Sequence, residues 1–368
     1  MHRSSTAWLA GTLLVAMLAG QGGAAYAAAA RTFVSAQTGA DGNTGVNCGP
    51  TAPCRTFGAA LGVTSPGGEV VVLSSGGYGP FTVTQSVTIT APEGVYAGIS
   101  VPSGAGINLN APGIDVTLKG LTINGTGGAF GIVVNSAQSL SVERLTVSNF
   151  PGSLSDQTAS GIDVGGAVEL KVVDSTFNNC LFGIILFNGV NALVQNTRFL
   201  ADYSTNVVFG TPGTTYSGII VQTVDNVSTT SLTARHCYFN AGVYAGFNAL
   251  PLNNTTGGLV RIAIEDSTVF GGSYGFFTQT NVAGNIVVTV ADSTFDVLNF
   301  GISANGNPPF TTTVTISGSS ITNMLNYALA TSAGNATIYT LGNNSIANNG
   351  TVFGGGNATG NIVAVARQ

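Results

Sequence analysis

Ile286 to Ile302 read Ile-Val-Val-Thr-Val-Ala-Asp-Ser-Thr-Phe-Asp-Val-Leu-Asn-Phe-Gly-Ile, and this pattern recurs along the chain. An alternating apolar run comes first, then a polar bend, one apolar residue, and a short Gly-Ile run. Alternation at every second residue predicts short strands with one buried face. The apolar residue after the bend recurs at steps of 24, 30, 22, 40, 30, 26, 26 and 25 residues: Ile123, Val147, Phe177, Phe199, Phe239, Val269, Phe295, Ile321 and Ile346.

A recurrence of about 20 to 50 residues is typical of a solenoid. The repeats are rich in β-branched residues and are broken by Gly, Asn and Ser, which favours strands and bends over the helical half of a leucine-rich repeat. We therefore expect a coil of three-stranded rungs in which equivalent residues stack about 4.8 Å apart. The Gly-Ile run, or its Gly-Phe equivalent, recurs at Gly98-Ile99, Gly131-Ile132, Gly161-Ile162, Gly183-Ile184, Gly218-Ile219, Gly275-Phe276 and Gly301-Ile302.

Small polar residues occupy most rungs at the position two residues before the apolar column. We expect them to point inward and to hydrogen-bond along the stack, because buried polar groups need partners. The column reads Leu121, Leu145, Ser175, Thr197, Cys237, Ser267, Ser293, Ser319 and Asn344.

This rung pattern resembles the right-handed parallel β-helix of the pectate-lyase-like superfamily, from about Phe33 to the C-terminus. The segments Arg31-Thr-Phe-Val-Ser and Gly67-Gly-Glu-Val-Val-Val also resemble the opening of uncharacterised exported bacterial β-helix proteins. The resemblance implies an all-β solenoid. Arg55 to Val63 is the one stretch that predicts a helix, and we expect it to cap the open end of the coil.

The first 27 residues fit a secretory signal peptide, with Arg3, an apolar run from Trp8 to Ala19, and Ala25-Tyr26-Ala27 as a small-x-small cleavage pattern. The apolar run is shorter than the roughly 20 residues that span a bilayer, and no other segment qualifies. We therefore predict a signal peptide over 1–27, an N-terminal cap over 28–68 and a β-helix over 69–368. The mature chain is expected to be secreted or periplasmic, with no membrane span.

Charged residues make up 7% of the chain, against about 25% in an average protein, and the formal net charge is -5. There is no basic stripe, which argues against a nucleic-acid partner. Cys48 and Cys54 lie in one short loop, and in an oxidising compartment we expect a disulfide between them. A zinc site there would need two further ligands nearby, so we expect no metal and no cofactor.

Most of the coil's charge falls in two outward columns that flank the bend. Stacking would bring Arg235 and His236 one rung from Glu265 and Asp266, and Asp266 one rung from Asp292. The superfamily that the chain resembles includes polygalacturonases with clustered aspartates, a histidine and a basic pair. That resemblance suggests Asp174, Arg235, His236, Asp266 and Asp292 as candidate catalytic residues, although Asp before Ser-Thr is also a common bend residue.

Two motifs of the superfamily's enzymes are absent, namely the Arg-x-Pro-x-x-Arg run of pectate lyases and the Gly-His-Gly of polygalacturonases. Gly271 to Gly275 matches Gly-x-Ser-x-Gly, but it falls between two predicted strands, where a nucleophile elbow needs a following helix. Asp266 and Asp292 also offer too few oxygens for a Ca²⁺ site.

Aromatic residues gather in and after the inserts of the longer rungs. If these inserts wall a groove along one edge of the coil, Tyr203, Tyr216, Tyr244 and Tyr274 could contact the faces of sugar rings. The alternative is that the rings pack the inserts onto the coil.

These observations leave two hypotheses of different classes. The first is an exported scaffold or binding protein that contacts a polysaccharide or an envelope glycan. The second is a carbohydrate-active enzyme, similar to polysaccharide lyases or glycoside hydrolases, that uses the charged columns.

Overall fold

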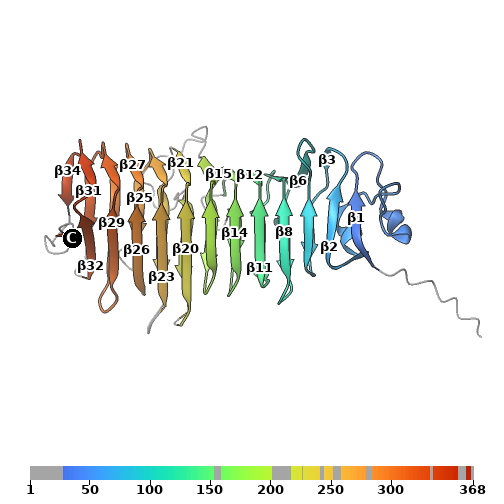
Figure 1. Cartoon of the computed structure of the whole chain (residues 1–368), viewed down its shortest axis with the longest axis horizontal. Helices are drawn as coiled ribbons and strands as arrows, with labels where there is room; N and C mark the ends of the chain where they lie inside the picture. Colours follow the sequence, from blue (N-terminus) through green and yellow to red (C-terminus); the bar gives the residue numbers. More distant parts are fainter. Residues whose placement is uncertain are drawn as a thin grey trace, which may run out of the picture.

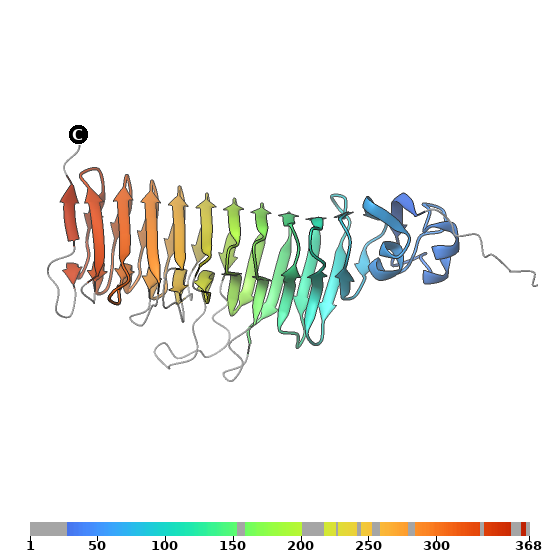
Figure 2. The same ribbon diagram turned by 90° about the horizontal axis from the view of Figure 1, so that it is seen from below.

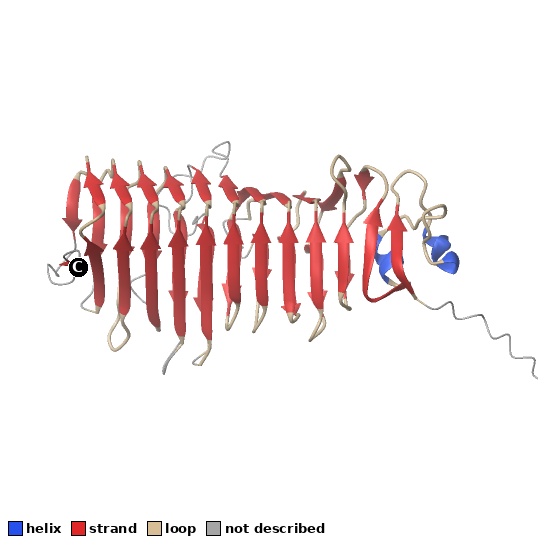
Figure 3. Ribbon diagram, viewed as in Figure 1, coloured by secondary structure: helices blue, strands red, loops and turns tan. Residues whose placement is uncertain are grey.

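The computed structural model describes residues 28–152, 159–200, 217–225, 227–240, 244–251, 258–278, 284–331, 335–354 and 362–365. The chain forms one long coil, and its strands run side by side along the whole axis (Figure 1). Helix occurs only at the N-terminal end of the described chain, beside the first strands (Figure 3). The sequence prediction of an all-β solenoid is confirmed.

Three parallel sheets make up the walls of the coil, and we name them A, B and C. Within the described residues, sheet A has 13 strands in the order β1 (Ala29–Val34), β2 (Thr64–Val72), β5 (Val87–Thr90), β8 (Asp115–Lys119), β11 (Ser139–Glu143), β14 (Glu169–Val173), β17 (Asn191–Gln195), β20 (Thr229–Arg235), β23 (Leu259–Glu265), β26 (Asn285–Ala291), β29 (Thr312–Ser317), β32 (Ala336–Leu341) and β35 (Ile362–Val365).

Sheets B and C each have 11 strands over the same described ranges. Sheet B consists of β3 (Gly76–Gly77), β6 (Ala97–Val101), β9 (Leu121–Gly125), β12 (Thr146–Phe150), β15 (Thr176–Cys180), β18 (Arg198–Leu200), β21 (Tyr238–Asn240), β24 (Thr268–Phe270), β27 (Thr294–Asp296), β30 (Ser320–Thr322) and β33 (Ser345–Ala347). Sheet C consists of β4 (Phe81–Val83), β7 (Ala105–Asn110), β10 (Phe130–Ser136), β13 (Ser160–Val164), β16 (Phe182–Phe187), β19 (Ser217–Thr223), β22 (Ala245–Pro251), β25 (Tyr274–Thr278), β28 (Phe300–Ala304), β31 (Tyr327–Thr331) and β34 (Thr351–Gly354).

The apolar column predicted from the sequence forms the inward face of sheet B in unbroken register. Ile123 pairs with Val147, and the pairing continues rung by rung to Ile321 and Ile346. Phe177, Phe199 and Phe239 stack with ring centroids 5.1 and 4.6 Å apart. Like residues thus lie directly above one another, which maximises apolar contact inside the coil.

The Gly-Ile runs lie in sheet C, with one exception. Gly98-Ile99 belongs to β6 of sheet B, where Ile99 pairs with Ile123, so its assignment to the second run was wrong. Gly106-Ile107 occupies the expected place in sheet C, because Ile107 pairs with Ile132. The two runs look alike locally, and only the pairing partner distinguishes them.

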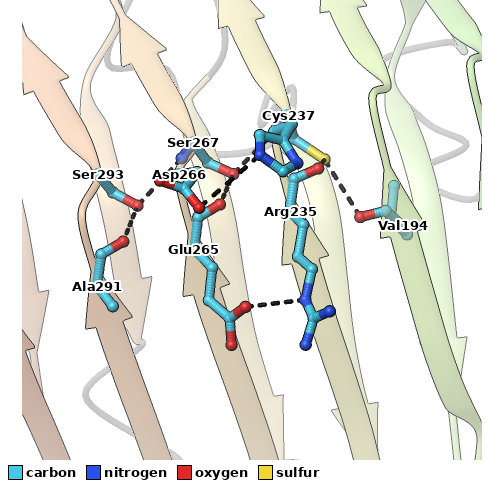
Figure 4. A network of polar contacts seen from close by, with 9 residues as sticks. Val194, Arg235, Cys237, Glu265, Asp266, Ser267, Ala291 and Ser293 are labelled. Carbon is cyan, nitrogen blue, oxygen red and sulfur yellow. Dashed lines mark hydrogen bonds and ion pairs between the residues drawn. The ribbon is translucent and has the colours of Figure 1, made fainter.

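The inward polar column forms a hydrogen-bonded ladder, as predicted. The Ser267 N–H donates to Ser293 Oγ and the Ser293 N–H donates to Ser319 Oγ, each at 3.2 Å. Each serine hydroxyl also donates to a carbonyl of its own rung, as Ser293 does to Ala291 (Figure 4). These buried hydroxyls therefore have partners without water.

A cap covers the N-terminal end of the coil. It contains the 3-10 helix η1 (Asp41–Val46) and the helix α1 (Phe57–Leu61), which lies inside the predicted helical stretch and is shorter. Phe57 is buried against Tyr78 and Phe81, with ring centroids 5.0 and 4.8 Å apart. Cys48 and Cys54 form a disulfide. Because β1 pairs with β2, sheet A begins within residues 28–68, which the sequence assigns to the cap.

The bend between sheets A and B has a left-handed backbone. Its residues have positive φ in eight successive rungs: Gly120, Arg144, Asp174, Asn196, His236, Asp266, Asp292 and Gly318. Gly, Asn, Asp and His tolerate this conformation better than most residues. Backbone conformation therefore accounts for the recurring Asp without any catalytic requirement.

A second left-handed position lies at the end of the sheet B strands or directly after them. It is occupied by Asn149, Asn179, Gly271, Asn323 and Asn348, but by Val297 (φ 54°) in one rung. A β-branched residue at positive φ is strained, at a cost of roughly 1–2 kcal/mol. We expect Val297→Asn to raise the free energy of unfolding by about 1 kcal/mol in urea denaturation. Because Val297 is exposed, little packing is lost; an equal gain from Val287→Asn, at an exposed strand position, would contradict the backbone explanation.

Candidate functional site

The charged residues singled out in the sequence lie on the bend between sheets A and B. Arg235 Nε is 2.8 Å from Glu265 Oε2, and His236 Nε2 is 3.8 Å from Asp266 Oδ2. Figure 4 shows Arg235 and Glu265 side by side on neighbouring strands, while the sulfur of Cys237 points to the carbonyl of Val194. The stacking of these residues therefore follows the predicted register.

The ion pairs of this charged cluster are solvent-exposed. The side chains of Arg235 and Glu265 are 48% and 37% exposed, and those of His236 and Asp266 are 58% and 56% exposed, so water screens both pairs. The carboxylate of Asp292 turns toward Gly318, whereas that of Asp266 faces His236. Asp174 accepts a hydrogen bond from Asn196 instead. Asp266 and Asp292 thus turn toward opposite neighbours in this structure, and a catalytic role for the cluster stays a prediction.

Sheet A carries a shallow depression that ends at Arg235. It measures about 440 Å³, and its polar lining includes Glu169, Lys171, Asn191 and Thr233. Asn191 donates to Glu169 Oε2 at 2.8 Å and accepts from Ser231, which ties these side chains to one another. Glu169, Asn191 and Arg235 in this lining therefore already have side-chain partners.

Aromatic side chains gather on the outer face of sheet C. Figure 2 shows the backbone of the coil after a turn of 90° about its long axis. Of the four predicted tyrosines, Tyr203 and Tyr216 lie outside the described residues. Tyr244 and Tyr274 lie together, with ring centroids 5.1 Å apart. They belong to a longer group that we call the aromatic strip: Tyr244, Tyr274, Phe277, Phe300 and Tyr327.

The aromatic strip follows the axis of the coil. Tyr274 pairs with Phe300 and Phe300 with Tyr327 in neighbouring strands, with centroids 4.8 and 5.8 Å apart. Tyr274 and Phe300 are nearly parallel, so their edges rather than their faces meet solvent. The strip is half-buried and forms an apolar ridge that carries tyrosine hydroxyls.

The hydroxyls of Tyr244 and Tyr274 on the strip are held in their protonated form. Burial raises the pKa of Tyr244 to about 12, and it raises that of Tyr274 as well. A hydrogen bond joins the two side chains. The strip therefore offers neutral hydroxyl groups beside apolar ring edges at any physiological pH.

Among the residues that the structure describes, sheet C also holds buried polar groups without hydrogen-bond partners. Asn248 pairs with Phe277 in the neighbouring strand, is 2% exposed, and its Oδ1 has no hydrogen-bond partner. The hydroxyls of Ser160 and Ser217 are also buried without partners. Such groups cost about 1–3 kcal/mol each when unsatisfied. Together with the outward but buried apolar residues Phe182, Ile185 and Ile220, they show that this face is not an ordinary solvated surface.

Asp163 lies on the same face, on β13, between Val133 and Ile185 of the neighbouring strands. Burial among apolar neighbours raises the pKa of its carboxyl from 3.8 to about 6. Sequence analysis missed this residue, because it interrupts a Gly-Ile-x-Val run as a single acidic residue and matches no motif. A carboxyl group that titrates near pH 6 can exchange protons under physiological conditions.

Comparison with known proteins identifies the fold. The family model for the right-handed β-helix region matches residues 105–288, half of the chain. The chain belongs to the right-handed β-helix family. A comparison with curated proteins finds no match.

Solved structures share this β-helix fold at low identity. The pectate lyase Pel9A matches with a TM-score of 0.56 and 16% identity, over 85% of this chain and 78% of that one. A rhamnogalacturonan lyase matches with a TM-score of 0.56 and 13% identity, over 91% and 84% of the two chains. The GH136 lacto-N-biosidase from Eubacterium ramulus matches with a TM-score of 0.59 and 9% identity, over 91% and 67%. At these identities the likeness establishes the fold alone.

Two features of this β-helix bear on metal and hydrolase sites. No group of three His, Cys, Asp or Glu side chains capable of holding a metal ion occurs among the residues that the structure describes. Ser273 of the Gly-x-Ser-x-Gly match precedes the strand β25 rather than a helix, and His236 lies on the bend between sheets A and B. The geometry therefore gives Ser273 no nucleophile elbow.

Phe277, Phe300 and Tyr327 were also missed in the sequence. The available signal was the aromatic residue directly before the Gly of the second run, as in Tyr274-Gly275 and Phe300-Gly301.

In the parts of the chain that the structure describes, no helix is long and apolar enough to cross a membrane.

Proposed function

We propose that this β-helix protein is an exported scaffold that binds a polysaccharide along the aromatic strip of sheet C. The observation that carries the proposal is the strip itself. The inward faces of all three sheets are already filled by aliphatic and aromatic residues, so the coil does not need further rings on its outer face. Ring edges and neutral hydroxyls match the alternating C–H and O–H groups of a sugar chain.

Two further observations support a carbohydrate ligand. The proteins that share this fold include a pectate lyase, a rhamnogalacturonan lyase and a lacto-N-biosidase. The N-terminal sequence from Arg3 to Ala27 fits an export signal, which would bring the chain to envelope or extracellular glycans.

Native electrophoresis in gels that contain polysaccharides tests this function. We expect at least one polymer to retard the full-length protein, and Phe300→Ala or Tyr327→Ala to weaken that binding about tenfold, or about 1.4 kcal/mol. Tyr339→Ala is the matched control, because this tyrosine is 37% exposed but lies on sheet A. If no polymer retards the protein, or if Tyr339→Ala weakens binding as much, the proposal is wrong.

Asp163 favours a second candidate function, a carbohydrate-active enzyme that works on the same face. Its carboxyl group, protonated in part at neutral pH, could donate a proton to a leaving glycosidic oxygen. In this form of the enzyme hypothesis, the proposed catalytic residue lies on sheet C and not on the exposed bend. Incubation with polysaccharides should then release reducing ends or unsaturated products, and Asp163→Asn should abolish that release while retaining retardation in the gel.

A further inference from the structure

The strands of sheet C are nearly free of charge. In the parts of these strands that the structure describes, Asp163 is the one formally charged side chain, and none carries Lys, Arg or His. The cations of the described chain lie on sheets A and B, on the bend between them, and in the cap: Arg31, Arg55, Lys119, Arg144, Lys171, Arg198, Arg235 and Arg261. The aromatic strip is therefore separated from the basic residues by the wall of the coil.

The sequence is also uncharged around the C-terminal half of the strip. Residues 297–366 contain no Asp, Glu, Lys, Arg or His, and Phe300 and Tyr327 lie in this segment. A carboxylate that loses water on binding needs a cationic or strong hydrogen-bonding partner, and arginine is the usual one for planar, bidentate contact. This face supplies no such partner from its strands.

The neutral groups of the strip fit hydroxyls better than carboxylates. Asn248 Oδ1 is a hydrogen-bond acceptor without a partner, and it lies beside Phe277. Because Asn248 is 2% exposed, a ligand on the outer surface does not reach this oxygen. The exposed part of the strip itself offers neutral hydroxyls, which exchange hydrogen bonds with sugar hydroxyls, whereas an ionised carboxylate only accepts. The raised pKa values of Tyr244 and Tyr274 keep their hydroxyls neutral as well.

We infer that the ligand of the aromatic strip is an uncharged polysaccharide, a chain of neutral hexose or pentose units, and not a polyuronate. The inference rests on the proposed polysaccharide-binding function and specifies its ligand class. It follows from the charge pattern of sheet C and from the neutral tyrosine hydroxyls of the strip.

The test compares neutral and anionic polymers in native gels at low and high salt. The neutral probes are arabinoxylan, hydroxyethylcellulose, dextran and laminarin, and the anionic probes are polygalacturonate and alginate. We expect a neutral polymer to retard the full-length protein, with affinity that changes less than twofold between 20 and 300 mM NaCl. Contacts between uncharged groups are not screened by salt, unlike ion pairs at the surface. Phe300→Ala should weaken this binding about tenfold.

Ala330→Lys adds a cation in the strand next to Ser303, beside the strip, and Thr315→Lys is the matched control on sheet A. We expect Ala330→Lys alone to create salt-sensitive binding to polygalacturonate. Retardation of the unmodified protein by polygalacturonate or alginate, but by no neutral polymer, would overturn the inference while the proposed function stands. Neutral-polymer binding that survives Phe300→Ala and Tyr327→Ala would place the ligand elsewhere and also overturn it. Retardation by none of the six polymers would refute the proposed function and this inference together.

Discussion

Gly275→Ala is expected to lower the free energy of unfolding by about 3 kcal/mol, although it adds a single methyl group. An inward Cβ at this position would overlap the ring of Phe295 and the carbonyl oxygen of Gly301. Phe295 is fully buried in the apolar column, so its ring has no free space to enter. Overpacking of this kind costs about 1–3 kcal/mol, and a backbone oxygen cannot move aside as a side chain can.

A double-mutant cycle with Phe295→Ala separates the ring from the backbone. Phe295→Ala alone should cost about 3–5 kcal/mol, because it leaves a cavity. In that background Gly275→Ala should cost about 1–2 kcal/mol less than in the unmodified protein, since the methyl group enters the cavity. Gly77→Ala is the control, as a Cβ there meets nothing within 4 Å. If the two substitutions have additive effects on the free energy of unfolding in urea, the Phe295 ring does not exclude the methyl group that Gly275→Ala adds.

Asp163→Asn is expected to stabilise the protein at neutral pH and to leave its stability at pH 3.5 nearly unchanged. The folded chain holds the carboxyl proton more tightly than the unfolded chain, with a pKa of about 6 against the ordinary 3.8. The contribution of Asp163 to stability is therefore most favourable below about pH 4 and becomes less favourable as the pH rises through 6. The difference corresponds to about 3 kcal/mol at most. Asparagine carries no charge to desolvate, so we expect a gain of about 2 kcal/mol at pH 7.5.

Urea denaturation at pH 3.5, 5.5 and 7.5 measures this effect. Asp296→Asn is the control, since Asp296 lies on sheet B, where Thr322 and Asn323 donate hydrogen bonds to it. Equal stability of Asp163→Asn and the unmodified protein at pH 7.5 would refute a buried carboxyl at this position. A residue that lowers the free energy of unfolding at neutral pH in this way is a good candidate for a functional role.

The rung architecture was readable from the sequence because stacking imposes one residue type on each column. Val269, Phe295 and Ile321 indicate a shared inward position, and the serine two residues before each of them indicates the ladder. The misplaced Gly98-Ile99 shows the limit of this reasoning. A short Gly-Ile run fits the inward face of either sheet, and the correct sheet depends on pairing with Ile123 across a whole rung.

The candidate site was less accessible to sequence reasoning. Charged residues attract attention in a sequence with so few of them, yet Arg235, His236 and Asp266 occupy a solvated bend whose backbone requirement accounts for Asp and His there. Asp163, in contrast, gains its properties from burial beside Val133 and Ile185. Burial on the outer face of a coil has no signature in the local pattern, because outward positions are ordinarily exposed.

The continuous register of the three sheets sets a constant spacing between equivalent residues along the proposed binding face. Each turn advances the surface of sheet C by about 4.8 Å along the axis of the coil. If the aromatic strip binds a polysaccharide as proposed, gain or loss of a whole turn would lengthen or shorten the binding face by that distance, without altering the chemistry of the remaining contacts. The number of turns therefore sets the length of this face.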